Sequence, residues 1–350
     1  MHWTANPVFG GSSPSGRSKR RKMKRLEDIG FYTLEDYRAE NLSMASPLWR
    51  CELILTPACN FKCPYCRSLR NEMKHQLTKE QAINTIKLWG SGRLKNIRFS
   101  GGEPTLWRDG NYKLADLVSL TKKEGIKRIA LSTNGSAPLH TYMDLCYAGV
   151  NDFSISLDAC CSTDHTKMTG NGGYWHTITN NITVLSKLTY VTVGVVLTDE
   201  NMPNLGNIIK FIDTLGVSDI RIIPAAQHGN RLQPEDIPEK LLSKYPILRY
   251  RINNMLQGKT IRSISSNDVN KCHLVKDDMV VGGNYHFPCI IFLREQGDPI
   301  GTIDNKQIAT IRRERYNWFK QHNTHIDQIC SKNCLDVCVD YNNKCEEYVR

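Results

Sequence analysis

The stretch that decides the fold is CNFKCPYC at residues 59–66, which places three cysteines within eight positions. It directly follows the apolar run CELIL at residues 51–55, which is typical of a buried strand. Three thiolates in this spacing can converge on one metal centre. Zinc is one candidate, although a closed structural zinc site takes a fourth protein ligand. An iron–sulfur cubane held by three cysteines would instead keep one iron open for another ligand, and spacing alone leaves both candidates standing.

Length and composition are those of an ordinary globular protein. The chain has 350 residues, of which 40% are hydrophobic and 23% are charged, enough for one barrel-sized domain with an appendage. No apolar run approaches the ~20 residues that span a bilayer, and no signal-peptide segment is apparent. We therefore expect a cytoplasmic protein that does not bind a membrane.

The positive charge is concentrated at the N-terminus. The formal net charge is +11, and residues 1–25 hold seven Lys or Arg and no acid, so the other 325 residues carry only +4. This composition predicts a disordered basic arm. Such an arm either contacts nucleic acid or an acidic partner, or serves only as a solvated tail.

Thirteen cysteines are many for a cytoplasmic chain, where disulfides do not persist, so their clustering indicates metal or redox chemistry. Beyond the group at residues 59–66, a second group lies within the last 80 residues: Cys272, Cys289, Cys330, Cys334, Cys338 and Cys345.

Short β-rich runs alternate with helical patterns from residue 51 to about 226. The predicted strands are 51–55, 96–100, 128–133, 152–158, 191–198 and 219–224. The predicted helices are 78–89, 111–124, 138–148, 173–188 and 204–215. Strands that are apolar on both faces indicate a parallel sheet covered by helices. The pattern alone leaves an open or closed βα barrel and a doubly wound sheet.

The alternation ends after Pro224, and the remainder is polar and then rich in cysteine. A small domain with few apolar residues needs another source of stability, which metal clusters provide. We predict an arm and lead-in at 1–48, a barrel at 49–235, a connecting segment at 236–260 and a cysteine-rich domain at 261–350.

Four motifs follow one another at the C-terminal ends of predicted strands. They are CNFKCPYC with Tyr65 before its last cysteine, GGEP at 101–104, STNG at 132–135 and SLD at 156–158. Each motif alone is weak or moderate, but their ordered occurrence is specific. Over residues 50–226 the chain resembles the radical S-adenosylmethionine (radical SAM) superfamily. The resemblance implies an α/β fold, a partial (βα)6 TIM-like barrel, with the active site at the strand C-terminal ends.

The resemblance also implies cofactors and their ligands. Three irons of a [4Fe-4S] cluster would be held by Cys59, Cys63 and Cys66, leaving one iron open for the SAM methionine. The SAM site would comprise Tyr65 at the adenine, Gly101, Gly102 and Glu103 at the ammonium, and Ser132, Asn134, Ser156 and Asp158 at the carboxylate and ribose. Reductive cleavage would give a 5′-deoxyadenosyl radical that abstracts a substrate hydrogen, and an electron donor such as flavodoxin or ferredoxin would be a partner.

The segment after SLD departs from the family pattern. Met168 stands where the family usually carries Arg, and Cys160-Cys161 stand where it often has Gly-Pro. We interpret the two thiols as loop residues without a catalytic role. For His165 we favour a structural hydrogen-bonding role.

The C-terminal cysteines resemble the SPASM extension of the superfamily, which binds auxiliary iron–sulfur clusters. Six cysteines fall short of the eight that two fully cysteine-ligated cubanes need. One auxiliary cluster with four of these ligands is possible, and so are two clusters with open or non-cysteine positions. A structural zinc site is an alternative, as is a metal-free helix carrying Cys330, Cys334 and Cys338 on one face.

The resemblance favours an enzyme that modifies a macromolecule, foremost a peptide or protein. An alternative is modification or isomerisation of a base in DNA or RNA, for which the basic arm would contact the phosphate backbone. A third hypothesis, from another class, is a non-enzymatic metal-cluster protein with a structural or sensing role.

Overall fold

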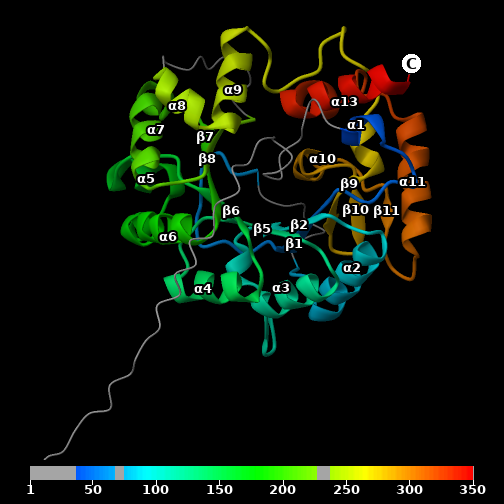
Figure 1. Ribbon diagram of the computed structural model, residues 1–350, viewed down its shortest axis with the longest axis horizontal. Helices are drawn as coiled ribbons and strands as arrows, with labels where there is room; N and C mark the ends of the chain where they lie inside the picture. Colours follow the sequence, from blue (N-terminus) through cyan, green and yellow to red (C-terminus); the bar gives the residue numbers. More distant parts are fainter. Residues whose placement is uncertain (1–36, 68–74, 227–236, 350) are drawn as a thin grey trace, which may run out of the picture.

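The computed structural model describes residues 37–67, 75–226 and 237–349 (Figure 1). The basic arm predicted at residues 1–25 lies outside these ranges, as does the start of the segment that follows the barrel. Among the described residues, no helix is both long and apolar enough to span a bilayer.

A single curved sheet of nine strands forms the centre of the molecule, in the order β11-β10-β9-β1-β2-β5-β6-β7-β8 (Figure 1). Six of its strands run parallel in chain order: β1 Arg50–Thr56, β2 Asn96–Gly101, β5 Arg128–Thr133, β6 Asp152–Ser156, β7 Tyr190–Leu197 and β8 Asp219–Pro224. They are the six strands that the sequence predicts, and the partial (βα)6 barrel is confirmed.

Helices cover the outer face of this sheet and alternate with its strands (Figure 1). They are α2 Lys79–Ser91, α3 Leu114–Lys123, α4 Leu139–Ala148, α5 Ser162–Thr169, α6 Trp175–Leu188 and α7 Leu205–Thr214. Helix α2 begins where the sequence predicts because Thr78 and Gln81 form a capping box, in which each side chain accepts the other's backbone N–H. Its residues Ala82, Ile86 and Trp89 are buried against the sheet.

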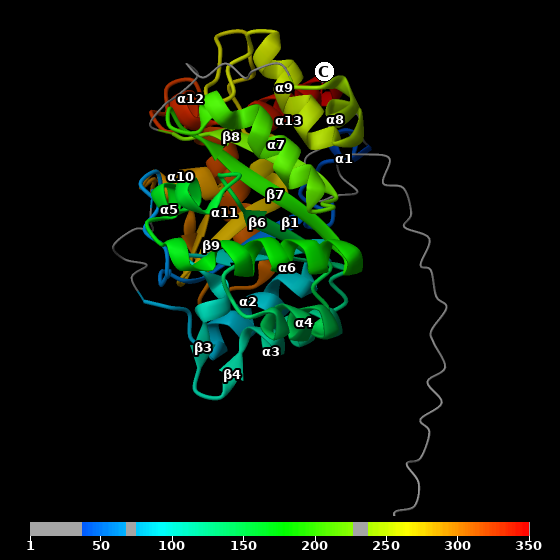
Figure 2. The same ribbon diagram turned by 90° about the vertical axis from the view of Figure 1, so that its left-hand side faces the viewer.

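A short hairpin between β2 and α3 was not predicted. Strands β3 Arg108–Asp109 and β4 Tyr112–Lys113 project away from the sheet (Figure 2). Each has only two residues, which is too short for a recognisable pattern in the sequence.

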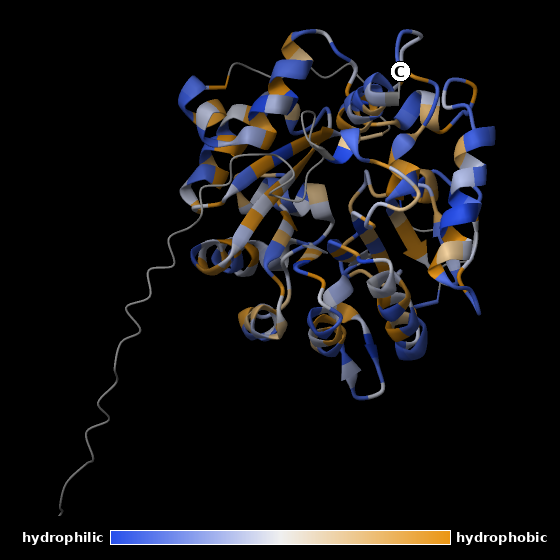
Figure 3. Ribbon diagram, turned by 45° about the vertical axis from the view of Figure 1, so that its right-hand side comes forward, coloured by the Kyte–Doolittle hydropathy of each residue, from blue (hydrophilic) through white to orange (hydrophobic). Residues whose placement is uncertain are grey.

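The prediction that the strands are apolar on both faces was wrong. Their outward side chains, such as Phe99 and Phe153, belong to the apolar core, whereas the inward ones, such as Arg98, Ser154 and Arg221, line a cavity. The reason is the curvature of the sheet, because helices α2 to α7 cover its convex face. On the concave face, α10 (Ile290–Arg294) packs near β1 and β9, where Ile54, Val280 and Leu293 form a small apolar cluster. Figure 3 shows the apolar residues concentrated on the strands and on the helix faces turned toward them.

The C-terminal segment joins the same sheet. Strand β9 Asp278–Gly282 pairs in parallel with β1, and β10 Tyr285–Phe287 and β11 Gly301–Thr302 continue in antiparallel fashion. The remaining helices are α8 Glu239–Lys244, α9 Pro246–Leu256, α10 Ile290–Arg294, α11 Ile308–Gln321, α12 Cys330–Asn333 and α13 Asp336–Val349. The predicted boundary at 236–260 stays a prediction, but the two sides of it share one sheet.

A buried ion pair fastens the N-terminal end of the described chain to the C-terminal segment. Arg38, on α1 (Tyr37–Glu40), donates from Nε and Nη2 to the Asp277 carboxylate at 2.9 and 2.7 Å. Its guanidinium also lies 4.8 Å from the centre of the Trp49 ring and 4.5 Å from that of Tyr341. Both partners of the pair are buried, at 5% and 2% exposure.

We expect Arg38→Met to lower the free energy of unfolding by roughly 3–5 kcal/mol, because it leaves the Asp277 carboxylate buried and unpaired. Lys79→Met, which removes an exposed partner of Glu80, is the matched control and should change the free energy of unfolding by less than about 1 kcal/mol. Urea denaturation measures the unfolding free energies of both variants. Equal losses of unfolding free energy would contradict a stabilising role of the Arg38–Asp277 pair.

A buried carboxylate on β8 makes stability depend on pH. Burial raises the pKa of Asp219 to about 7, although backbone N–H groups of Ile247 and Ile220 donate to it and oppose the rise. Because the folded-state pKa exceeds the unfolded one, this contribution to stability is complete below about pH 4 and is lost as the pH rises through about 7.

We therefore expect the wild-type unfolding free energy to fall by about 2–4 kcal/mol more than that of Asp219→Asn between pH 4 and pH 8. Asp144→Asn, at an exposed position, should follow the wild type. Denaturant unfolding across this pH range is the measurement, and parallel curves for Asp219→Asn and wild type would refute the expectation.

Candidate active site

The cysteine loop begins where β1 ends and lines a cavity of about 480 Å³, here named the cofactor cavity. All three cysteines of the loop contribute to its wall, and all are free thiols. The other predicted residues that line it are Tyr65, Gly101, Gly102, Ser132, Asn134, Ser156 and Asp158. The ends of the strands therefore bring the cysteine loop close to Asp158 and the other motif residues, although about 100 positions of sequence separate Cys59 from Asp158.

The paired glycines hold the cysteine loop in place. Gly102 donates its backbone N–H to the Thr56 carbonyl and Glu103 donates to the Ala58 carbonyl, both at 2.7 Å. A Cβ on Gly102 would lie 2.3 Å from the Ala58 oxygen. Gly101 has φ of +146°, which side-chain-bearing residues rarely adopt. Both glycines are needed because the two backbones touch.

Glu103 is fully buried and does not belong to the residues that line the cofactor cavity. Its carboxylate accepts hydrogen bonds from Thr105, from the Thr133 hydroxyl at 2.8 Å and from the Asn134 backbone at 2.7 Å. Burial raises the pKa of this carboxyl, and the hydrogen bonds oppose the rise. In this structure Glu103 joins the ends of β2 and β5, and its contact with a SAM ammonium stays a prediction.

Tyr65 and Asp158 form one unit at the cavity wall. The Tyr65 hydroxyl donates to the Asp158 carboxylate, whose other oxygen accepts the Val196 backbone N–H at 2.6 Å. Burial raises the pKa of Asp158 to about 6. This hydrogen bond orients the Tyr65 ring between the cysteine loop and β6.

Asn134 and Ser132 occupy the end of β5. The Asn134 amide donates to the Asn60 side chain at 2.8 Å and thereby ties the strand end to the cysteine loop. Ser132 accepts a hydrogen bond from Arg98 Nη1 at 3.0 Å. Ser156, at the end of β6, is exposed to the cavity.

The predicted hydrogen-bonding role of His165 was wrong. Its ring is 1% exposed, and neither ring nitrogen has a hydrogen-bond partner in the described part of the chain. It packs instead against Phe61 and Trp175, with ring centres 5.8 and 5.7 Å away. An imidazole in an aromatic setting is kept neutral, and burial accordingly lowers its pKa.

The other departures from the family pattern lie beside the site. Met168 is buried, and its sulfur accepts a hydrogen bond from the Thr198 hydroxyl at 3.9 Å. Cys160 accepts a hydrogen bond from the Asn204 amide, and Cys161 precedes the first turn of α5. Neither thiol is among the described residues that line the cofactor cavity.

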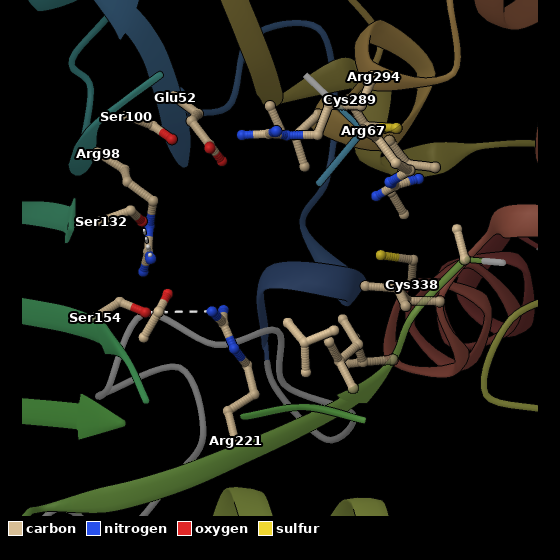
Figure 4. A pocket seen from close by; sticks show the side chains of 18 of the residues that line it. Glu52, Arg67, Arg98, Ser100, Ser132, Ser154, Arg221, Cys289, Arg294 and Cys338 are labelled. Carbon is tan, nitrogen blue, oxygen red and sulfur yellow. Dashed lines mark hydrogen bonds between the residues drawn. The ribbon is translucent and has the colours of Figure 1, made fainter. Parts of the chain in front are cut away.

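A second cavity of about 390 Å³, here named the inner cavity, lies inside the curved sheet (Figure 4). It shares part of its wall with the cofactor cavity, namely Tyr65, Cys66, Ser100, Ser132, Ser156, Val196 and Arg294. Cys289, which lies beside Arg294 in Figure 4, and Cys338 of the C-terminal segment also line it. A species formed at the cysteine loop would therefore face a molecule held in the inner cavity.

Five of the six C-terminal cysteines form an electrostatically connected group. Burial raises the pKa of the Cys330 thiol, and the charges of Cys272 and Cys289 raise it further. A hydrogen bond with Cys338 and burial together raise the pKa of the Cys334 thiol. Burial therefore favours the neutral thiols, and a metal cluster bound among them would supply the cations that stabilise the thiolate form.

Cys345 lies two turns beyond Cys338 on α13. Burial raises the pKa of its thiol, while Tyr341, Arg38 and Lys276 oppose the rise. Its role as a cluster ligand stays a prediction. The alternative of one helix presenting Cys330, Cys334 and Cys338 does not occur, because α12 ends at Asn333 and Cys334 has an extended conformation before α13 begins.

Two kinds of site residue were not predicted from the sequence. The first is a group formed by His322 and Asp327 with Cys330, in which His322 Nε2 lies 3.4 Å from the Cys330 sulfur. The second is the set of arginines that line the inner cavity. The arginines could have been recognised in the sequence, since Arg98 and Arg221 interrupt otherwise apolar strands at inward positions.

Comparison with known proteins agrees with this geometry. Residues 53–212 match the Radical SAM superfamily. Probable GTP 3′,8-cyclases of Sulfurisphaera tokodaii and Saccharolobus solfataricus are 27% and 28% identical over 203 and 179 residues. These alignments cover 57% and 51% of this chain and 64% and 57% of the relatives, so the chain spans less than two thirds of their length.

Two solved structures show the same fold. Streptococcus suis SuiB bound to its precursor peptide SuiA has a TM-score of 0.56 at 13% identity, covering 79% of this chain and 66% of that one. The structure of anSMEcpe with bound AdoMet has a TM-score of 0.56 at 15% identity, covering 87% and 96%.

Residues 53–212 thus match the radical SAM superfamily, whose members use a [4Fe-4S] cluster and SAM. The cofactor cavity fits both groups, because three free thiols of one loop face a space walled by glycine backbone and polar strand ends. The cysteine-rich C-terminal segment is consistent with auxiliary clusters.

We expect Gly102→Ala to displace the cysteine loop, since its Cβ would overlap the Pro57 and Ala58 carbonyls. The unfolding free energy should fall by about 1–3 kcal/mol, and iron retained after anaerobic reconstitution should fall with it. Gly173→Ala, whose Cβ would have no neighbour closer than 4.0 Å, is the control. A variant that keeps wild-type stability and iron would show that the contact does not hold the loop.

Proposed function

We propose that this enzyme cleaves SAM reductively at the cysteine loop and abstracts a hydrogen atom from a substrate held in the inner cavity. The observation that carries the proposal is the wall shared by the two cavities, which includes Tyr65, Ser132 and Ser156. When bound, the cluster and SAM supply the 5′-deoxyadenosyl radical. The protein's residues position the reactants and exclude water.

Each part of the cofactor cavity has a proposed role. Cys59, Cys63 and Cys66 would hold three irons and leave the fourth open to SAM. Gly101 and Gly102 would offer backbone carbonyls to the SAM ammonium at the place where they pack on the cysteine loop. Tyr65, oriented by Asp158, would lie against the adenine, and polar groups at the ends of β5 and β6 would meet the carboxylate and ribose.

We assign the five connected thiols, Cys272, Cys289, Cys330, Cys334 and Cys338, as the ligand set of one auxiliary iron–sulfur cluster. A cubane needs four of them. Since Cys289 and Cys338 also line the inner cavity, this cluster would border the substrate as well. That position suits a cluster that accepts or donates an electron during turnover.

Two substrate classes are candidates. A peptide or protein is supported by the fold shared with SuiB, which binds a precursor peptide. A nucleotide or a nucleic-acid base is supported by relatives named as probable GTP 3′,8-cyclases. The charge on the wall of the inner cavity favours the second class.

We further place the enzyme in the cytoplasm with an electron donor such as flavodoxin or ferredoxin. All 13 cysteines are free, and such thiols stay reduced in that compartment.

The test is iron counting and 5′-deoxyadenosine analysis on the reconstituted full chain. Wild type should bind about eight irons and form 5′-deoxyadenosine after reduction. A variant with Cys59, Cys63 and Cys66 changed to Ala should keep about four irons and form none. A variant with Cys272 and Cys289 changed to Ala should lose the irons of the auxiliary cluster but still cleave SAM.

Cys160→Ala is the matched control, because its thiol lines neither cavity, and it should behave as wild type. Cleavage of SAM by the triple variant would refute the assignment of the cysteine loop. Loss of all iron from that variant would refute the auxiliary cluster.

A further inference from the structure

The inner cavity has a strongly cationic wall. Among the described residues, seven arginines and two acidic residues line it. Figure 4 shows Arg98 and Arg221 on one side of the cavity and Arg67 and Arg294 on the other. Unpaired charges are costly to bury, so each cation needs either a carboxylate of the protein or an anion from outside.

Some of the arginines are neutralised by carboxylates behind the wall. Arg67 pairs with Glu295 and Arg251 with Asp336. The pairing of Arg251 is incomplete, because its Nε and Nη2 are buried and have no hydrogen-bond partner among the described residues. Acidic neighbours therefore account for only part of the positive charge.

Two arginines have only neutral hydrogen-bond acceptors. Arg221 Nη2 donates to the Ser154 hydroxyl at 3.2 Å, and Arg294 Nη2 donates to the Gly101 carbonyl at 3.3 Å. Neither forms an ion pair within the ranges that the structure describes. The acid that faces Arg221 is Glu52, which lines the same cavity.

Arg98 shares its carboxylate with a second cation. Asp152 lies 4.0 Å from Arg98 Nη2 but accepts a closer hydrogen bond from Arg128 Nε at 3.1 Å. The Nε of Arg98 is buried without a hydrogen-bond partner among the described residues. The charge of Arg98 is thus only partly compensated, and it acts on the nearby Arg221.

The arginines also act on one another electrostatically. Burial lowers the pKa of Arg221 to about 10, and the charges of Arg98 and Arg251 lower it further. Burial and the charge of Arg294 lower the pKa of Arg67 to about 10. Arg67 and Arg221 both remain cationic at neutral pH, so the cavity wall carries mutually repelling charges.

The fold preserves this arrangement. Gly194 on β7 is paired with Arg221 on β8, and a Cβ there would lie 3.4 Å from Arg221 Nη2. That distance is an ordinary van der Waals contact, so the guanidinium packs directly on Gly194 while it donates to Ser154.

We propose that the inner cavity binds a phosphate-bearing small molecule, of the size of a nucleoside triphosphate, whose phosphates are held by Arg98, Arg221 and Arg294. Guanidinium forks match phosphate oxygens in geometry and charge. A single carboxylate would satisfy one such fork, whereas several converging forks fit several phosphates. A volume of about 390 Å³ is within the range of small-molecule sites. The proposal rests on the proposed function, since the remainder of the molecule would then face SAM at the shared wall.

The test is binding of inorganic triphosphate and of the four common nucleoside triphosphates to the reconstituted full chain, by calorimetry without reductant. Arg98→Gln and Arg221→Gln should each weaken triphosphate binding by roughly tenfold or more. Arg313→Gln, at an exposed position on α11, should leave it unchanged. At least one nucleotide should bind more tightly than inorganic triphosphate.

Melting temperatures of the ligand-free variants separate a binding role from a structural one. Removing a repelled cation should leave the melting temperature of Arg221→Gln unchanged or raised, while triphosphate should no longer raise it. A lowered melting temperature with triphosphate binding retained would overturn the proposal, and so would preferential binding of an acidic peptide.

The two proposals fail in distinguishable ways. Failure to bind any triphosphate by a protein that still cleaves SAM would refute only the substrate class. Arginine-dependent triphosphate binding without SAM cleavage would refute only the radical chemistry.

Discussion

The site depends on the contact between two backbone segments, the loop after β1 and the glycine pair after β2. Adjacent parallel strands end at the same edge of a sheet, so these segments meet as soon as β1 and β2 pair. The bonds from Gly102 to Thr56 and from Glu103 to Ala58 then fix the path of the cysteine loop. The buried Glu103 carboxylate extends this connection to the end of β5 through Thr133 and Asn134.

The curvature of the sheet explains why polar side chains are buried in the centre of this protein. Helices cover the outer face, so the apolar core lies there. Along each strand, successive side chains alternate between this core and the interior. The interior therefore receives Arg98 and Ser100 from β2, Ser154 from β6 and Arg221 from β8. Their burial is unfavourable without a ligand, which is typical of sites that recognise charged groups.

The C-terminal segment acts as a wall of the same cavity because it extends the barrel sheet. Strand β9 pairs along the free edge of β1, and α10 follows directly after β10. Arg294, on α10, lines both cavities and donates to Gly101. Cys289, at the start of α10, joins the thiol group on one side and the inner cavity on the other. The C-terminal thiols, the inner cavity and the cofactor cavity are thereby neighbours.

The sequence by itself determined the six parallel strands, the helices between them and the cysteine, glycine and serine motifs at the strand ends. These features depend on the residues within one strand or loop, so their patterns can be recognised locally. Only the tertiary structure decided that β1, β2 and β8 each contribute an arginine to one cavity, that β9 joins β1 and that His322 lies beside Cys330. Residues distant along the chain meet there, and no local pattern records which of them will meet, because the curvature of the sheet and the packing of the C-terminal segment decide it.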